Sequence, residues 1–316
     1  MDYELYIMDY ELYKKLFYTV NEQTSDSNYE PSRDFLDGVD KIFLSFSEEE
    51  CEWIEQNRYF FSASKMIAGS KKNEDGTYDS NVDLDFSNKK FKDGKLPFKL
   101  NKVNGSFKVF DCGLTTLEGC PKIVTKLFSC FKNNLTSLKG GPEEVGMHYS
   151  CMANKLKSLE FLPKKLRSLD CSINKLRSLD NFVPNELSSF SCFKNNLTSL
   201  KGSPTKIISY FDCSSNKLTS LEDGPRYVGG GYICARNKLI SLKGAPKSIT
   251  VSEGFSNFNC SHNELTSLEF APQYVSGTFD CSKNKLTSYE FIPKKVKKVI
   301  SKGNPITYEQ WIKQNE

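Results

Sequence analysis

The sequence predicts a repeat solenoid, a parallel β-solenoid with short strands and a largely irregular second side. Three observations support this fold class. Cysteines recur every 20 or 21 residues between Cys130 and Cys234. Most units place an aromatic residue two positions before the cysteine, then an asparagine, two leucines and a Gly-x-Pro turn after it. One unit has only about five apolar side chains, too few to offset the chain entropy lost on folding, so the units must stack.

Each position of the unit has a structural explanation. In Phe-x-Cys the ring and the thiol share one face of a short strand, because side chains alternate along a strand. The asparagine column, with Asn216 as an example, is expected to bond backbone groups where the chain leaves the strand. Leu218 and Leu221 mark the two positions that fill the interior. The Gly-x-Pro segment then reverses the chain, with proline fixing its own φ.

Nine units fit this pattern between Phe110 and Val296. The first lacks three residues between Cys112 and Leu114, and the eighth carries about five extra around 252–256. The predicted organisation is therefore an acidic, mainly helical (or α+β) N-terminal domain at 1–80, N-terminal cap coils at 81–109, the solenoid at 110–298 and a C-terminal cap at 299–316.

Both ends carry helix-start signals. Thr307 to Gln310 reads as a capping box that opens a short helix, whose Trp311 and Ile312 would cover the last coil. Ser301 stands there in the place of the cysteine. In the N-terminal region, a capping box at 47–50 predicts a helix near 48–58.

The unit F-x-C-x-x-N-x-L-T-S-L resembles the leucine-rich-repeat superfamily, with Phe-x-Cys where Leu-x-Leu usually stands. Its finer form is similar to repeats encoded by tailed bacteriophages and related mobile elements. The resemblance covers about residues 82–305. It implies a binding scaffold, and it supplies no catalytic residues to this chain.

The charge is distributed unevenly along the chain. Residues 1–80 contain 8 Lys/Arg and 18 Asp/Glu, a net charge of 8 − 18 = −10. Residues 81–316 contain 35 Lys/Arg and 21 Asp/Glu, a net charge of 35 − 21 = +14. The asymmetry is compatible with two parts that have different partners, or with two parts that neutralise one another.

No catalytic constellation is evident. The two histidines, His148 and His262, lie several units apart, and there is no CxxC pair, phosphate-binding loop or nucleophile elbow. Regularly spaced cysteines beside aromatic residues are expected to be small core residues, and not metal ligands or nucleophiles. The prediction is therefore a chain without enzymatic activity, cofactor or metal. No apolar stretch has the length of a membrane span and no secretory signal is evident, so we expect a location in the host cytoplasm or inside a virion.

A candidate binding face consists of the residues that should point outward along the strands and just beyond them. We expect partner contacts from apolar anchors, acidic positions and a lysine border. Mutual neutralisation of the Asp and Lys columns is the competing interpretation. Phe255, in the insertion, is a further candidate. The predicted face comprises Phe131, Met152, Asp170, Phe193, Asp212, Ile233, Asp280, Lys175, Lys217, Lys238 and Phe255.

These residues predict a non-enzymatic scaffold that binds another protein. A phage-encoded virion component and an intracellular adaptor for a host protein are both compatible with it. Nucleic-acid binding through the basic solenoid is the alternative from another class. The oligomeric state is open.

Overall fold

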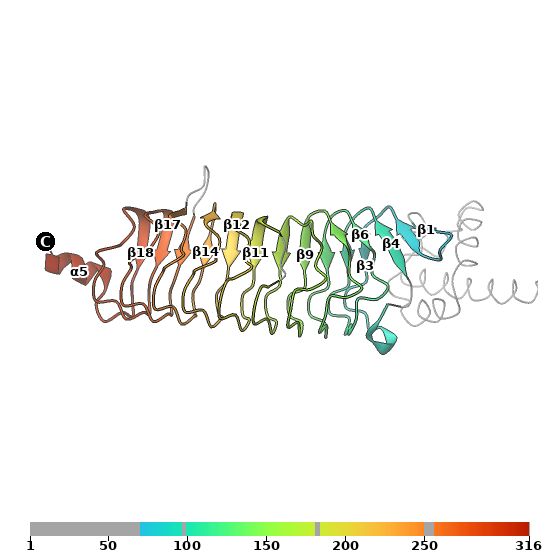
Figure 1. Cartoon of the computed structure of the whole chain (residues 1–316), viewed down its shortest axis with the longest axis horizontal. Helices are drawn as coiled ribbons and strands as arrows, with labels where there is room; N and C mark the ends of the chain where they lie inside the picture. Colours follow the sequence, from blue (N-terminus) through green and yellow to red (C-terminus); the bar gives the residue numbers. More distant parts are fainter. Residues whose placement is uncertain (1–69, 97–98, 181–183, 250–255, 316) are drawn as a thin grey trace, which may run out of the picture.

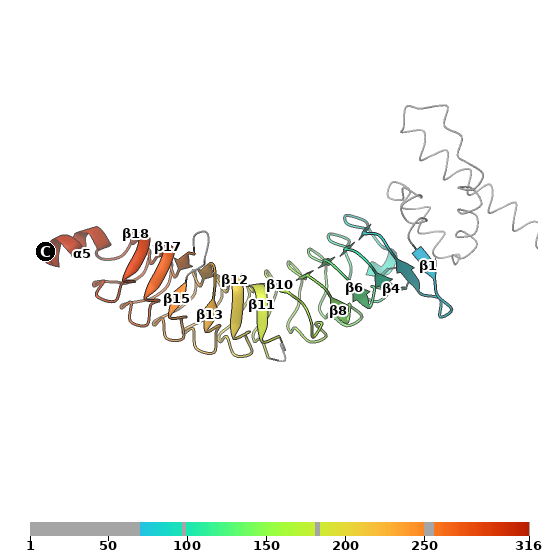
Figure 2. The same cartoon turned by 90° about the horizontal axis from the view of Figure 1, so that it is seen from above.

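The computed structural model describes residues 70–96, 99–180, 184–249 and 256–315. It is a parallel β-solenoid in which successive coils of the chain lie side by side along one axis (Figure 1). A view from above shows that the solenoid is gently bowed (Figure 2). The predicted fold class is confirmed. Most of the predicted N-terminal domain, including the helix near 48–58, lies outside the described residues.

The strands form two hydrogen-bonded series, and apart from the β1–β2 pair every pairing is parallel. The first series comprises β1 (Ser70–Lys72), β2 (Tyr78–Ser80), β4 (Leu100–Val103), β6 (Ile123–Val124) and β8 (Glu144–Val145). The second comprises β3 (Leu84–Asp85), β5 (Phe107–Lys108), β7 (Phe128–Ser129), β9 (His148–Ser150), β10 (Ser168–Asp170), β11 (Glu186–Ser191), β12 (Lys206–Asp212), β13 (Tyr227–Val228), β14 (Tyr232–Ile233), β15 (Ser248–Ile249), β16 (Phe258–Asn259), β17 (Tyr274–Asp280) and β18 (Lys295–Ile300).

The core consists of columns that run the length of the solenoid. Phe211, Cys213, Leu218 and Leu221 of one coil are all fully buried, which confirms that the ring and the thiol of each strand face inward. The aromatic column is in register from coil to coil. Tyr232 of β14 lies opposite Phe258 of β16, 26 residues later, which confirms the insertion of about five residues.

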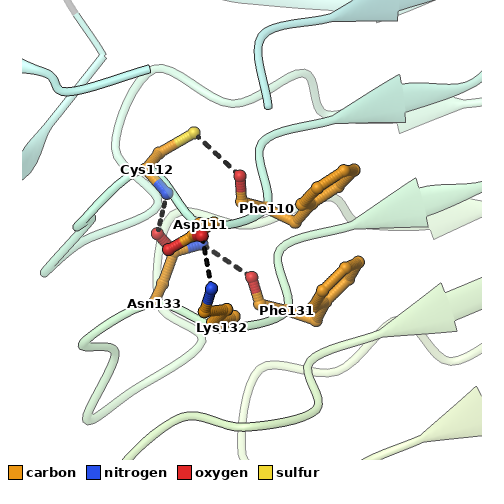
Figure 3. Close-up of polar contacts among 6 residues, drawn as sticks. All are labelled: Phe110, Asp111, Cys112, Phe131, Lys132 and Asn133. Atoms are coloured by element: carbon orange, nitrogen blue, oxygen red, sulfur yellow. Dashed lines mark hydrogen bonds and ion pairs between the residues drawn. The ribbon is translucent and has the colours of Figure 1, made fainter. Parts of the chain in front are cut away.

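The first predicted unit is wrong in register. Phe107, and not Phe110, pairs with Phe128 at the start of a coil. Cys112 therefore occupies the asparagine column and not the cysteine column, and the coil has no three-residue deletion. Figure 3 shows the thiol of Cys112 bonding the Phe110 carbonyl, at 3.3 Å, while the Asn133 side chain makes the same kind of bond one coil on.

This shift also changes the outward-facing row. In a unit that began at Phe110, Asp111 would lie between the inward-facing residues of the strand, but Lys108 holds that position. Asp111 lies instead at the turn, where its carboxylate pairs with Lys132 of the next coil (Figure 3). The mistake arose because an aromatic-x-Cys sequence at 110–112 matches the repeat, although the ladder aligns the coil three residues earlier.

The predicted capping box at Thr307 to Gln310 is confirmed, but Ile312 is not among the residues that pack on the core. The helix α5 (Tyr308–Asn315) starts with reciprocal bonds, in which Thr307 N–H donates to Gln310 Oε1 at 2.8 Å and Gln310 N–H donates to Thr307 Oγ1 at 3.3 Å. Trp311 packs on the core, as expected, and Tyr308 accompanies it. Ser301 occupies the cysteine position and is buried. Among the described residues, helix occurs only in α5 and in the short 3-10 turn η2 (Lys92–Gly94).

The first strand series ends at β8, in the middle of the solenoid. Residues 164–167 form no strand between β8 and β11. The N–H of Arg167 bonds the carbonyl of Met147, which lies beyond the end of β8. A hollow of about 660 Å³ opens at this break and is lined in part by Val145, Leu166 and Glu186.

Candidate partner-binding surface

The aspartates of the predicted face take part in local turns. Asp170, Asp212 and Asp280 are half-buried. The Oδ1 atom of each accepts the backbone N–H of the serine two positions later, at 3.0, 2.8 and 3.0 Å respectively. One carboxylate oxygen per coil therefore stabilises the end of the strand, as turn-forming Asp side chains do. Ile233, in the same column, is half-buried as well.

The predicted apolar anchors are only half-exposed and do not form one continuous row. Phe131 stacks on Phe110 of the preceding coil, with ring centroids 4.4 Å apart. Met152 follows Phe131 in the next coil, so these three side chains form a short apolar row. Phe193 stands apart from them, because serines occupy its position in the coils on either side.

The predicted lysine border is exposed. Lys175, Lys217 and Lys238 each follow a buried asparagine, and they form no ion pair within the described ranges. In the coil after Lys238 the same position is Glu264, which pairs with Lys285 at 3.2 Å. The positive column is therefore interrupted near the C-terminal end.

Phe255, the remaining predicted site residue, lies outside the described residues. Ser256, at the end of the insertion, is fully buried. Its hydroxyl donates to the carbonyl of Gly229 at 3.2 Å. The end of the insertion is thus attached to the body of the preceding coil.

Sequence reasoning missed a group of exposed apolar side chains around a glycine run, which we call the tyrosine patch. It consists of Ile208, Tyr210 and Tyr227, which are 47%, 37% and 52% exposed, and of the segment 229–231. A Cβ on Gly229 would lie 2.1 Å from the Ile208 carbonyl oxygen and 3.4 Å from the Tyr227 hydroxyl.

The rest of the segment lies equally close to the preceding coil. A Cβ on Gly230 would lie 2.2 Å from the carbonyl oxygen of Ser209, and one on Gly231 would lie 3.1 Å from the Tyr210 ring. The three glycines thus leave a strip of backbone without side chains next to Tyr210 and Tyr227. The Tyr210 hydroxyl donates to Asp212 at 3.2 Å. Partial burial and the nearby Asp212 carboxylate raise the pKa of Tyr210 above its usual value.

A signal for this patch was present in the sequence. The run at 229–231 is the only stretch of three consecutive glycines, in a chain with 19 glycines. The tyrosines at 210 and 227 stand just outside the inward-facing positions of their strands. Two exposed aromatic residues beside the glycine run indicate a contact surface, because exposed apolar patches on a protein surface often mark interaction sites.

The described residues show no evident metal-binding site or reactive nucleophile. They contain no group of three or more His, Cys, Asp or Glu side chains able to hold a metal ion. Burial lowers the pKa of His148 and raises the pKa of the column cysteines, including Cys213, so these thiols stay protonated and unreactive. None of the helices in the described ranges is long and apolar enough to cross a membrane.

No protein-family model and no curated protein matches this chain. Two solved structures are similar to it. One is YopM from Yersinia enterocolitica WA-314, with a TM-score of 0.41 and 16% identity, covering 87% of this chain and 74% of that one. The other is YopM, a leucine-rich effector protein from Yersinia pestis, with a TM-score of 0.39 and 19% identity, covering 65% and 69%. At these values the two structures carry no argument about the activity or partners of this chain.

Proposed function

We propose that this chain is a non-enzymatic scaffold that binds another protein through the side of the solenoid. The tyrosine patch is the observation that carries this proposal. Exposed tyrosines on a rigid support contribute strongly to protein interfaces, because they bury a large area and lose little side-chain entropy. The stacked coils hold Tyr210 and Tyr227 in place, so binding needs little further ordering.

The test uses the full-length chain as bait in quantitative affinity capture. A protein captured by the wild type should be lost with the double substitution Tyr210→Ala and Tyr227→Ala. Ile240→Ala is the matched control, since Ile240 is 65% exposed and lies in another part of the coil. Equal capture by the double variant, with an unchanged circular dichroism spectrum, would contradict the proposal.

The row of Phe110, Phe131 and Met152 is a second proposed contact area on the predicted face. It lies several coils away from the tyrosine patch, so one extended partner could use both. Phe131→Ala should weaken capture of the same protein if both areas contact one partner. An effect of Phe131→Ala on a different captured protein would assign this row to a second partner.

Nucleic-acid binding is the alternative that a specific observation favours. Lys175, Lys217 and Lys238 are exposed and unpaired among the described residues. Binding of labelled single-stranded DNA should then weaken steeply with salt. Alanine substitutions at the three lysines should lower the slope of log Kd against log salt concentration by about one to three. Binding that does not respond to salt would exclude this function.

A role in a phage particle is a further proposal, supported by the resemblance of the repeat unit to phage-encoded repeats. A structural component should be present in purified particles in a fixed stoichiometry, which quantitative mass spectrometry measures. An adaptor for a host protein should be absent from the particles and present in the infected cell.

A further inference from the structure

The C-terminal end of the solenoid has an open strand edge. Among the described residues, β18 pairs with β17 only. In inner coils, the N–H of the aromatic column and that of the cysteine column donate to the next coil, as in Tyr232 to Asn257 O at 2.9 Å and Cys260 to Asp280 O at 2.8 Å. Val299 and Ser301 hold these two positions in β18, and none of the described residues forms a coil beyond it. Their N–H groups therefore point outward along the edge.

The apolar core is also incompletely covered at this end. Val275 and Phe279 of β17 are fully buried. Their partners in β18, Val296 and Val299, are only half-buried, although both belong to the core. The difference arises because each inner coil is covered by the next one, whereas none of the described residues forms a coil over β18.

The C-terminal helix covers a different part of this end. Tyr308 and Trp311 of α5 pack on Tyr289, with ring centroids 5.5 and 6.2 Å away. The Tyr289 hydroxyl donates to the carbonyl of Ile306 at 2.8 Å. Tyr289 belongs to the leucine side of the coil, and Figures 1 and 2 show α5 at the tip of the chain beyond β18. Within the ranges that the structure describes, the strand edge is therefore left open.

The open edge is strongly basic. Four exposed lysines, at 294, 295, 298 and 302, border it and form no ion pair within the part of the chain that the structure describes. The segment 294–302 contains no acidic residue. Two carboxylates lie close to it, since Asp280 bonds Ser282 and Glu309 lies 3.5 Å from the Ser301 hydroxyl, but neither forms an ion pair with these lysines among the described residues.

We propose that β18 is a docking edge for an extended acidic segment of a partner protein, which pairs with it as an additional strand. The backbone groups of Val299 and Ser301 would supply hydrogen bonds, and the half-buried valines would supply apolar contact. Lysines on an edge strand repel a second basic strand and so prevent pairing between copies of this edge. The same charges favour a strand that carries glutamate or aspartate. This site is separate from the tyrosine patch and does not depend on it.

The test measures binding of fluorescein-labelled peptides to the full-length chain by anisotropy. A short peptide that alternates Glu and Val should bind, and its affinity should fall with salt. The same peptide with a central proline should bind at least about tenfold more weakly, because proline cannot donate to the ladder. A peptide that alternates Lys and Val should not bind.

Charge-reversal variants locate the site. Lys295→Glu with Lys298→Glu should weaken binding of the acidic peptide by about tenfold or more. Lys217→Glu with Lys238→Glu is the matched control, and it should leave the affinity unchanged. Hydrogen exchange at the amides of Val299 and Ser301 should slow when the acidic peptide is present.

Three outcomes would overturn this proposal. The first is that the acidic peptide does not bind, and the second is that it binds equally to both double variants. The third is that a single-stranded oligonucleotide binds in preference to the peptide and that this binding is lost in Lys295→Glu with Lys298→Glu. The last result would assign the edge to nucleic acid.

Discussion

The buried asparagine of each coil joins that coil to its neighbour. Asn216 Nδ2 donates to the carbonyl of Cys192 in the preceding coil and to that of Cys213 in its own, both at 3.0 Å. Its Oδ1 accepts the N–H of Leu197 at 3.0 Å. A primary amide provides the donors and the acceptor that these backbone groups need. The residue before it, Ser215, has a φ of 54°, so the chain turns sharply into this position.

Replacing this amide should destabilise the solenoid. Asn216→Ala leaves buried backbone groups without partners and should lower the free energy of unfolding by about 1–3 kcal/mol or more. Urea denaturation measures the change. The adjacent exposed substitution Lys217→Ala should change it by less than about 0.5 kcal/mol. Equal effects of the two substitutions would show that the asparagine ladder does not link the coils.

The two core tyrosines of the aromatic column are accommodated by small neighbours. The hydroxyls of Tyr149 and Tyr232 are buried and have no hydrogen-bond partner among the described residues. They lie 3.3 and 3.5 Å from the Cβ that Gly141 and Gly224 would carry. In other coils, where the column residue is phenylalanine, the equivalent position holds larger residues such as Ala245. Glycine therefore makes room for the hydroxyl.

Removing the Tyr232 hydroxyl should not lower the free energy of unfolding. Tyr232→Phe should leave stability unchanged or raise it by about 1 kcal/mol, because a buried hydroxyl without a partner is unfavourable. Phe258→Tyr is the reverse test and should destabilise, since Ala245 and not glycine precedes its coil. Thermal unfolding of both variants measures the difference. A clear loss of stability in Tyr232→Phe would mean that this hydroxyl has a stabilising partner.

At the scale of elements, most strands contain only two or three residues, so they depend on their neighbours. The polar turn residues compensate for this shortness. Besides the aspartates of the strand ends, the serine before the second core leucine forms a local bond. The hydroxyls of Ser199, Ser220 and Ser241 accept the N–H two residues later, at 3.0 to 3.1 Å. These repeated side-chain bonds close the turns that a short strand cannot close alone.

The C-terminal helix depends on its capping box. Thr307→Ala removes the acceptor for Gln310 N–H and should cost about 0.5–2 kcal/mol of local stability. Hydrogen exchange of the α5 amides should become faster, while exchange in β17 stays unchanged. Thr287→Ala, at an exposed position of the preceding coil, is the control and should leave α5 unaffected. Unchanged exchange of α5 in Thr307→Ala would mean that Tyr308 and Trp311 alone hold the helix.

At the scale of the whole molecule, one continuous core contains a column of buried thiols. The ten cysteines of the described ranges are free and buried. Burial raises the pKa of Cys112 to about 11 and of Cys281 to about 12, from the ordinary value of 9.0. It raises the pKa of the inner column cysteines, such as Cys213, well above 9.0. The folded chain thus keeps protons that the unfolded chain releases at alkaline pH.

This difference predicts alkaline destabilisation. The contribution of the thiols is complete below pH 9, and it is lost as the pH rises from about 9 towards the folded-state pKa values. The free energy of unfolding, measured in urea, should therefore fall as the pH rises from about 9 to about 11. Cys213→Ala should make this dependence shallower, because it removes one of the titrating groups. A free energy independent of pH over this interval would contradict burial of the thiols.

The sequence alone determined the repeat, the inward-facing columns, the insertion and the capping box, because each depends on contacts within one coil or on a spacing that recurs. Only the tertiary structure decided the register at the N-terminal end. There Cys112 replaces asparagine, and only hydrogen bonds to the neighbouring coil reveal the alignment. The tyrosine patch and the open edge of β18 were likewise visible only in the tertiary structure. Exposure at one position depends on which side chains the adjacent coils bring beside it, and that is a property of the stacked molecule.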